Sequence, residues 1–363
     1  MQITRVETIH LSLPSSRQRV SLSDPQKPTA TNFVAVQLHT KGGQTGLGFT
    51  SSLVAGRTIA NLIEAELGPL VVGENAIDNE KLFAKVQTRF RSAGWSGIAA
   101  RSYAAIDIAL WDLKAKAAGM PLYRLLGGAR PAAACFAGDL AIRGSDAAHT
   151  LKAARPLLEQ GVLGVAVEVG SGDMQLDADR VQQIRDGIGE SAWLGISVDG
   201  RYELGTALAM AHFYEDDVGI DWIESPIPME DRIGYQRLAE RMEVPIALGS
   251  SFDNRDDFRR VLERGEVRVL RPDVLRLGGI TPLLKIVALA EAYHVSVVPF
   301  RLPEIGLHLA CGLPNVPMAE WGSWLAPAFS DPVMPKGGKL TPLGKPGNGL
   351  ELSTNALSKF RVE

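Results

Sequence analysis

The stretch from Trp193 to Phe300 repeats one unit, and this repeat most limits what the chain can fold into. Each unit begins with a short run rich in Val, Ile, Leu and Ala, the pattern of a strand buried on both faces. The runs end about 25 residues apart, at Asp199, Glu224, Ser250, Asp273 and Phe300. A strand, its loops and a crossover helix need about that length, so the spacing predicts successive βα units of a barrel. In such a barrel the chemistry lies where the strands end.

Composition places the chain among globular proteins without a nucleic-acid or membrane surface. Of its 363 residues 45% are hydrophobic and 22% are charged, the formal net charge is −3, and no basic block appears. No segment approaches the roughly 18 uninterrupted apolar residues of a membrane span, and the N-terminus lacks the apolar core of a signal peptide. Cys135 and Cys311 stand far apart inside apolar runs. We expect two reduced, buried thiols in a cytoplasmic protein.

The first third of the chain has a different pattern. Residues 1 to about 50 indicate antiparallel strands, with a strand at Thr31–His39 and a turn at 41–46. The polar, Pro- and Ser-rich segment between the first two strands predicts a loop, which over a barrel mouth would act as a lid. Helical spacing follows over 58–91 and again over 96–128.

Several motifs follow one another in a fixed order. AIDIALWDLKAKAAGMPLYRLLGG comes first, and then VDG, WIESP, IALGS, RPDVLRLGGIT, PF, EIGLHLA and MAEW. The first resembles the signature helix of the mandelate racemase and muconate lactonising branch of the enolase superfamily, and the others resemble its barrel strands. The resemblance implies an α/β fold: a modified (β/α)7β TIM-type barrel over 131–324, and an α+β capping domain over 1–130 that 325–363 completes. Homo-oligomers are common in that family.

Members of the family that the chain resembles abstract the proton alpha to a carboxylate, and Mg²⁺ stabilises the resulting enediolate. Racemases, dehydratases and cycloisomerases share this step. The three metal-ligand positions correspond here to Asp199, Glu224 and Ser250. Because Mg²⁺ prefers charged oxygen ligands, Ser250 in place of a glutamate predicts that Mg²⁺ binding is weak or absent. Asp253 would replace the lost ligand if its loop curled inward, and Ser250→Glu should strengthen metal binding.

An alternative for the two intact positions needs no metal. Asp199 and Glu224 would then end their strands in ion pairs with Arg201 and Arg276. Both interpretations stay open at the level of the sequence.

The base positions implied by the resemblance have changed more. On the second barrel strand the family has a Lys-x-Lys pair, where this chain has Ala166 and Glu168. Ala166 cannot accept a proton. Glu168 would act as a base if desolvation raised its pKa, or it would form an ion pair with an arginine at the barrel mouth.

On the other side of the barrel, Asp273 matches the family's aspartate, but Phe300 stands where the family has its histidine. Asp273 would thus be an orienting group with nothing to orient. Relatives with a lysine on the sixth strand have Arg276 as their counterpart here, which binds anions but does not readily abstract protons. Glu304 and Glu320 match acidic positions near the family's active site, with a helix N-terminal carboxylate and an ion-pair partner as structural alternatives.

Three hypotheses follow for the function. The first is a divergent enzyme acting on a small carboxylate, with a barrel mouth lined by Glu168, Arg201, Arg276, Arg301 and Glu304. The second is a pseudoenzyme that binds an anionic ligand or partners an active paralogue. The third is an ordinary racemase or dehydratase in which loop residues fill the missing roles. Losses on three different strands argue against the third, and none of the six histidines replaces the missing base.

The arginines also indicate where a ligand would bind. Arg201 and Arg301 are the predicted substrate-binding residues, because guanidinium groups pair well with carboxylates. By resemblance, substrate specificity comes from the capping-domain loops Ser15–Thr31 and Ser51–Arg57.

Overall fold

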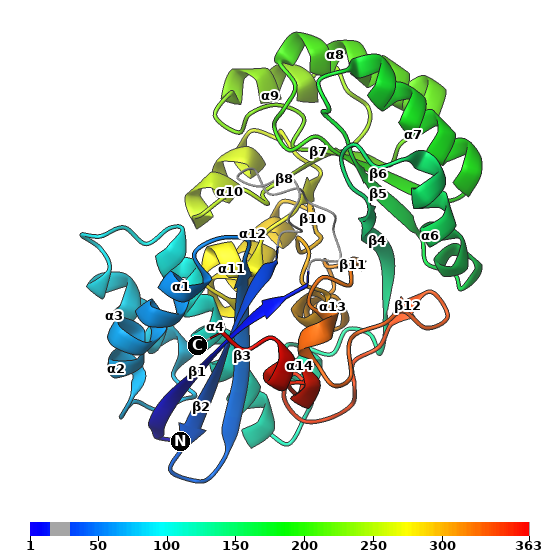
Figure 1. Cartoon of the computed structure of the whole chain (residues 1–363). Helices are drawn as coiled ribbons and strands as arrows, with labels where there is room; N and C mark the ends of the chain where they lie inside the picture. The colour runs from blue at the N-terminus through cyan, green and yellow to red at the C-terminus, as the bar shows by residue number, and fades with distance from the viewer. Residues whose placement is uncertain (15–29, 363) are drawn as a thin grey trace.

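The computed structural model describes residues 1–14 and 30–362, and most of the expected lid falls outside them. Two sheets organise the described part of the chain (Figure 1). A three-stranded antiparallel sheet lies beside a much larger parallel sheet that curls round on itself. Helices cover the outside of the curled sheet.

The antiparallel sheet has the order β1-β2-β3. Its strands are β1 Ile3–Leu13, β2 Thr31–Thr40 and β3 Thr45–Ser52. Side chains of β2 alternate between two apolar cores, as the period of a strand requires. Phe33 and Ala35 join the core shared with the barrel, whereas Val34 and Val36 join a core beneath the N-terminal helices. This sheet therefore packs on both faces.

Helices fill the rest of the N-terminal third. They are α1 Gly56–Leu62, the π-helical η1 Ile63–Leu67, α2 Gly68–Val71, α3 Asn79–Arg89, α4 Ile98–Ala117 and α5 Leu122–Leu125. The helical pattern predicted over 58–91 is thus broken between α2 and α3. Val72 is extended (ψ 134°) and Gly73 has a positive φ of 87°, so the helix ends there.

The large sheet contains eight parallel strands. They are β4 Ala133–Ala141, β5 Gly164–Glu168, β6 Trp193–Ser197, β7 Trp222–Glu224, β8 Ile246–Leu248, β9 Val269–Leu270, β10 Ser296–Val297 and β11 Met318–Trp321. Their order is β10-β9-β8-β7-β6-β5-β4-β11. Strands that are consecutive in the chain therefore pair with each other from β4 to β10, whereas the last strand, β11, pairs with the first, β4. The amide of Val297 donates to the carbonyl of Asn315 (2.9 Å), which links β10 to the segment leading into β11.

A helical segment lies between each pair of consecutive strands. These are α6 Ala147–Glu159, α7 Met174–Ile188, α8 Leu204–His212 with η2 Phe213–Val218, α9 Arg232–Ala239, α10 Arg255–Glu263, α11 Val274–Leu277 with α12 Ile280–Ala292, and α13 Pro303–Gly312. Eight strands and seven helical connections confirm the predicted (β/α)7β barrel with an antiparallel capping sheet.

Helix α4 ties the two sheets together through two buried aspartates. Asp107 accepts hydrogen bonds from the amide (2.9 Å) and the hydroxyl (2.6 Å) of Thr281, at the start of α12. Gly279 is required beside it, because a Cβ there would lie 2.3 Å from an Asp107 oxygen. Asp112 accepts from the amides of Leu47 in β3 and Asn348 in the C-terminal segment, both at 2.8 Å.

The C-terminal segment contacts both sheets. It contains η3 Ala326–Ala328, β12 Lys339–Leu340 and α14 Thr354–Lys359. Ser12 and Val362 donate backbone hydrogen bonds to Phe360 and His10 respectively, which places the chain end against β1 (Figure 1). By contrast, β12 pairs with β4 of the barrel. The domain division at residues 130 and 324 therefore stays a prediction.

Both cysteines are buried and free, as expected. Among the helices that the structure describes, none is both long and apolar enough to cross a membrane.

Candidate functional site

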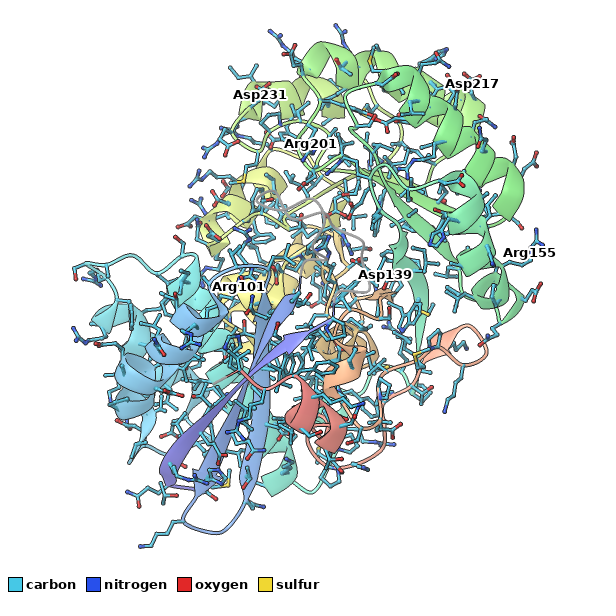
Figure 2. The ribbon with its side chains drawn as sticks, viewed as in Figure 1. Arg101, Asp139, Arg155, Arg201, Asp217 and Asp231 are labelled. Carbon is cyan, nitrogen blue, oxygen red and sulfur yellow. The ribbon has the colours of Figure 1, made fainter. Side chains whose placement is uncertain are left out.

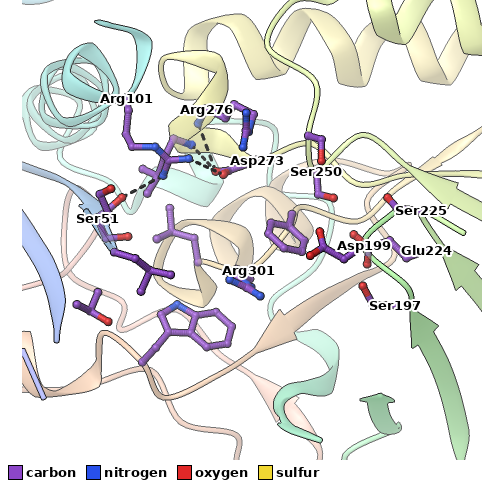
Figure 3. A pocket seen from close by; sticks show the side chains of 18 of the residues that line it. Ser51, Arg101, Ser197, Asp199, Glu224, Ser225, Ser250, Asp273, Arg276 and Arg301 are labelled. Carbon is purple, nitrogen blue, oxygen red and sulfur yellow. Dashed lines mark hydrogen bonds and ion pairs between the residues drawn. The ribbon is translucent and has the colours of Figure 1, made fainter. Parts of the chain in front are cut away.

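A cavity of about 380 Å³ opens at the carboxyl ends of the barrel strands (Figure 3). All five predicted strand-end residues line it, as their spacing indicated. The rest of its lining comes from strands of both sheets and from neighbouring helices and loops, namely Thr31, Ser51, Ser52, Leu53, Val54, Arg101, Glu168, Ser197, Ser225, Ser251, Leu275, Arg276, Arg301, Leu302 and Trp324. The capping-domain loop that follows β3 therefore forms part of this wall.

Four residues of the cavity wall have a backbone conformation that side chains rarely adopt. Asp199, Ser225, Arg301 and Leu302 have φ values of 61°, 47°, 53° and 56°. Such conformations cost on the order of 1–3 kcal/mol each and persist where the surrounding structure holds them, often at functional sites. Their concentration around one cavity marks it as the candidate site.

The two carboxylates at the predicted metal positions have different environments. The side chain of Asp199 is 69% exposed and lies 3.8 Å from Arg143. Glu224 is buried, and Nε of Arg271 lies 3.2 Å from its carboxylate. The partners suggested by the sequence, Arg201 and Arg276, are therefore wrong, since other arginines occupy those places.

Burial raises the pKa of Glu224, and the charge of Arg271 together with a hydrogen bond from the Ser250 hydroxyl opposes that rise. Two residues at predicted ligand positions, Glu224 and Ser250, thus bond to each other. Asp253 does not replace the missing ligand, because it pairs with Arg276 at 3.1 Å and lies outside the cavity wall. Within the described ranges, no three acidic, histidine or cysteine side chains are grouped to hold a metal ion. The donor set does not fit Mg²⁺.

Arg271 is one residue of this site that the sequence interpretation missed. It is 1% exposed and stands behind the cavity wall. Nε and Nη2 donate to Glu224 and Glu320, and Nη1 donates to the carbonyls of Val298 (3.1 Å) and Pro299 (3.3 Å). Its guanidinium also faces three aromatic rings at 5.0–5.6 Å, those of Phe136, Trp222 and Phe300. The signal in the sequence was a charged residue at the end of an apolar strand, directly before Pro272.

The positions where the resemblance places a base have different surroundings. Ala166 packs against a small core cluster, and Glu168 lines the cavity. Glu168 lies 3.4 Å from Nη2 of Arg301 and accepts a hydrogen bond from the backbone amide of Arg143 (3.3 Å). The Phe300 ring, at the position that the resemblance assigns to the family's histidine, lies 4.7 Å from the Arg301 guanidinium. The ion-pair alternative for Glu168 is therefore the one that the structure shows.

Asp273 has partners, contrary to the expectation that it would have nothing to orient. Its carboxylate accepts from the amides of Leu275 (2.8 Å) and Arg276 (3.3 Å), which caps α11. Arg101 of α4 pairs with it at 3.3 Å and also donates to the carbonyl of Ser51 (3.0 Å), as Figure 3 shows. Arg101 was not singled out from the sequence, because the spacing of apolar residues around it predicts a packed helix.

Three predicted site residues stand away from the cavity wall. Arg201 is exposed and lies in the green part of the barrel, apart from Arg101 (Figure 2). Glu320 is buried behind the wall, where it accepts from Arg271 and from the amide of Arg301 (2.9 Å). Glu304 is buried at the start of α13, and burial raises its pKa to about 7. One Glu304 oxygen has no partner within the part of the chain that the structure describes.

Comparison with known proteins agrees with the fold. Residues 149–356 match the enolase C-terminal domain-like family, and residues 13–127 match the N-terminal domain of mandelate racemase and muconate lactonizing enzyme. L-talarate/galactarate dehydratase of Salmonella typhimurium is 30% identical over 360 residues, which cover 97% of this chain and 90% of that protein. A cycloisomerase of Streptomyces coelicolor that acts on 3,6-anhydro-alpha-L-galactonate is 28% identical over 91% of each chain.

The solved structure of L-talarate dehydratase from Polaromonas sp. JS666, in complex with Mg and L-glucarate, gives a TM-score of 0.90 at 31% identity. The match covers 99% of this chain and 98% of that one. These relatives are sugar-acid dehydratases and cycloisomerases, and magnesium is bound in solved structures among them.

Proposed function

The chain belongs to the mandelate racemase and muconate lactonizing enzyme family of the enolase superfamily, and we propose that its strand-end cavity binds a small carboxylate without the family's metal-assisted proton abstraction. The observation that carries this proposal is a set of three arginines in the lining of the cavity. Arg101 comes from α4, Arg276 from α11 and Arg301 from the loop after β10. Guanidinium groups converging from separate elements suit a carboxylate ligand.

Two of these arginines keep hydrogen-bonding capacity beyond their acidic neighbours. Arg276 pairs with Asp253 and Arg301 with Glu168, each through a terminal nitrogen. The buried Nε atoms of Arg276 and Arg301 have no partner among residues 1–14 and 30–362. These two atoms are closed off from solvent, but the side chains of Arg276 and Arg301 as a whole are 35% and 31% exposed. Both side chains line the cavity, so their guanidinium groups can meet a ligand carboxylate there.

The residues at the predicted metal-ligand and base positions support weak or absent Mg²⁺ binding and the loss of proton abstraction. Ser250 offers a neutral oxygen, and Glu224 already has Ser250 and Arg271 as partners. Ala166 and Phe300 carry no group that accepts a proton, and arginines stay protonated at usable pH. The cavity therefore favours a binding protein over a conventional racemase or dehydratase.

A divergent enzyme is the second candidate, favoured by one observation. Glu168 lines the cavity beside Arg301, so a carboxylate lies within the volume that a ligand would occupy. Arg301 lies 3.4 Å from this carboxylate, so Glu168 would have to leave that ion pair to take a proton from a substrate.

Binding is tested by calorimetric titration with a panel of hydroxy acids, sugar acids, N-acyl amino acids and small dicarboxylates. We expect at least one class to bind, and Arg276→Gln to weaken that binding by about 10- to 100-fold, since a charge-assisted hydrogen bond contributes roughly 1.5–3 kcal/mol. Arg201→Gln is the matched control, because Arg201 lies outside the cavity wall. No binding across the panel, or equal loss in both variants, would contradict the proposal.

A further inference from the structure

Arg271 has the charge and the position of a resident cation. Its guanidinium lies between two buried carboxylates that belong to different strands, Glu224 at the end of β7 and Glu320 in β11. Glu224 occupies one of the family's metal-ligand positions. A positive charge is therefore already fixed beside the only buried carboxylate among the predicted ligands.

The guanidinium is held from every side. Each of its three nitrogens donates, to two carboxylates and two backbone carbonyls, and three aromatic rings surround it. An arginine buried in this way keeps its charge, because a guanidinium is not deprotonated in proteins. It can leave Glu224 only by abandoning two ion pairs in a medium where they are strong.

A divalent ion beside Glu224 would meet this charge. Mg²⁺ binds carboxylate oxygens at about 2.0–2.1 Å and needs nearly octahedral geometry. Nε of Arg271 lies 3.2 Å from Glu224, so an ion bound to that carboxylate would be within a few ångströms of a fixed positive charge. The repulsion is weakly screened, because both Arg271 and Glu224 are buried.

We infer that the Arg271 guanidinium is a built-in replacement for the divalent cation at these strand ends: it stays paired with Glu224, as it does with Glu320, and keeps metal ions out. It supplies charge but no coordination position for a ligand, because its nitrogens are engaged and it stands behind the cavity wall. This inference concerns the same end of the barrel as the proposed ligand site. It does not depend on any ligand, and metal titration of the ligand-free protein tests it separately.

If Arg271 keeps metal ions out, the expectation for Ser250, at the third metal-ligand position, changes. From the sequence, Ser250→Glu alone should strengthen metal binding. With Arg271 in place we expect that substitution to gain nothing, because the repulsion remains. Removing the guanidinium together with the substitution should open the site.

The test is a titration of the full-length, chelator-treated protein with Mn²⁺, following the loss of the free-ion signal by electron paramagnetic resonance. We expect no binding stronger than about millimolar by the wild type or by Ser250→Glu, and at least roughly tenfold tighter binding by Arg271→Gln/Ser250→Glu. If circular dichroism shows that this variant does not fold, the variant Arg271→Gln/Glu320→Gln/Ser250→Glu takes its place. Its glutamine at position 320 removes a buried carboxylate that would otherwise lose its partner. Asp199→Asn in the binding variant should abolish the gain.

Two results would overturn the inference. One is low-micromolar Mn²⁺ binding by the wild type that Asp199→Asn removes, which would show that metal and Arg271 coexist. The other is equal Mn²⁺ affinity in Ser250→Glu and in a folded variant that also lacks Arg271. If neither variant without Arg271 folds, Ser250→Glu decides: Mn²⁺ binding roughly tenfold tighter than that of the wild type would overturn the inference, and unchanged weak binding would support it.

Discussion

The arginines around the cavity differ in how much of each side chain meets solvent. Arg271 is 1% exposed, and all of its nitrogens donate within the protein. The side chain of Arg276 is 35% exposed, and its Nε has no partner within the described ranges. Arg271 is therefore closed to a ligand, whereas the exposed part of the Arg276 side chain can meet one.

Replacing Arg271 should destabilise the protein strongly. Arg271→Met leaves Glu224 and Glu320 buried without a counter-charge, and breaking a buried ion pair from one side costs about 3–5 kcal/mol. Arg259→Met is the matched control, because Arg259 forms an exposed pair with Glu263 (2.9 Å, side chains 50% and 44% exposed). Exposed pairs contribute little, so this change should leave stability nearly unaltered. Urea denaturation of both variants measures the difference. Equal losses would show that the triad contributes no more than a surface pair.

At the scale of elements, α4 joins the capping sheet, the barrel and the C-terminal segment. Its two buried aspartates bind the start of α12, β3 and the segment that contains Asn348. Arg101, near its N-terminus, also reaches Asp273 at the cap of α11. One helix thus fixes both the packing of the two sheets and one wall of the cavity.

The burial of Asp107 predicts a pH dependence of stability. Burial raises its pKa from 3.8 to about 7, partly opposed by the hydrogen bonds from Thr281. The folded protein therefore holds a proton that the unfolded chain has released, over the window between about pH 4 and 7. The contribution of Asp107 to the free energy of unfolding is largest below this window and is lost as the pH rises through it.

Asp107→Asn should flatten this part of the pH profile, leaving the share that comes from other buried acids such as Glu304. Urea denaturation at intervals from pH 4.5 to about 7.5 measures it. Asp217→Asn, at an exposed position on η2, is the control and should follow the wild type. If the free energy of unfolding changes with pH by the same slope in the wild type, Asp107→Asn and Asp217→Asn, Asp107 has its ordinary pKa in the folded protein.

At the scale of the whole molecule, the barrel and the location of the site could be predicted because both follow from local spacing. A strand and its helix repeat every 25 residues or so, and parallel strands end at one side of a barrel. The prediction that the five strand-end residues lie together is therefore confirmed, since one cavity is lined by Asp199, Glu224, Ser250, Asp273 and Phe300.

The pairing of charges could not be predicted, because partners come from distant strands. Arg271 meets Glu224 and Glu320 at separations of 47 and 49 residues, and Arg101 meets Asp273 at 172. Spacing puts these residues near one end of the barrel, but it does not say which carboxylate each guanidinium faces. Arg201 was expected at the mouth of the barrel, but it is exposed and does not line the cavity. Spacing along the chain did not predict the direction of its side chain either.

Proton abstraction tests the central claim most directly, because every racemase, dehydratase or cycloisomerase of this family must remove an alpha proton. The measurement is deuterium incorporation from D2O into each member of the carboxylate panel, with the full-length protein and Mg²⁺ present. We predict that no substrate incorporates deuterium, since Ala166, Phe300 and the protonated arginines offer no base and Glu168 is held by Arg301. Incorporation by the unmodified protein that Glu168→Gln abolishes would contradict the account and name Glu168 as the base.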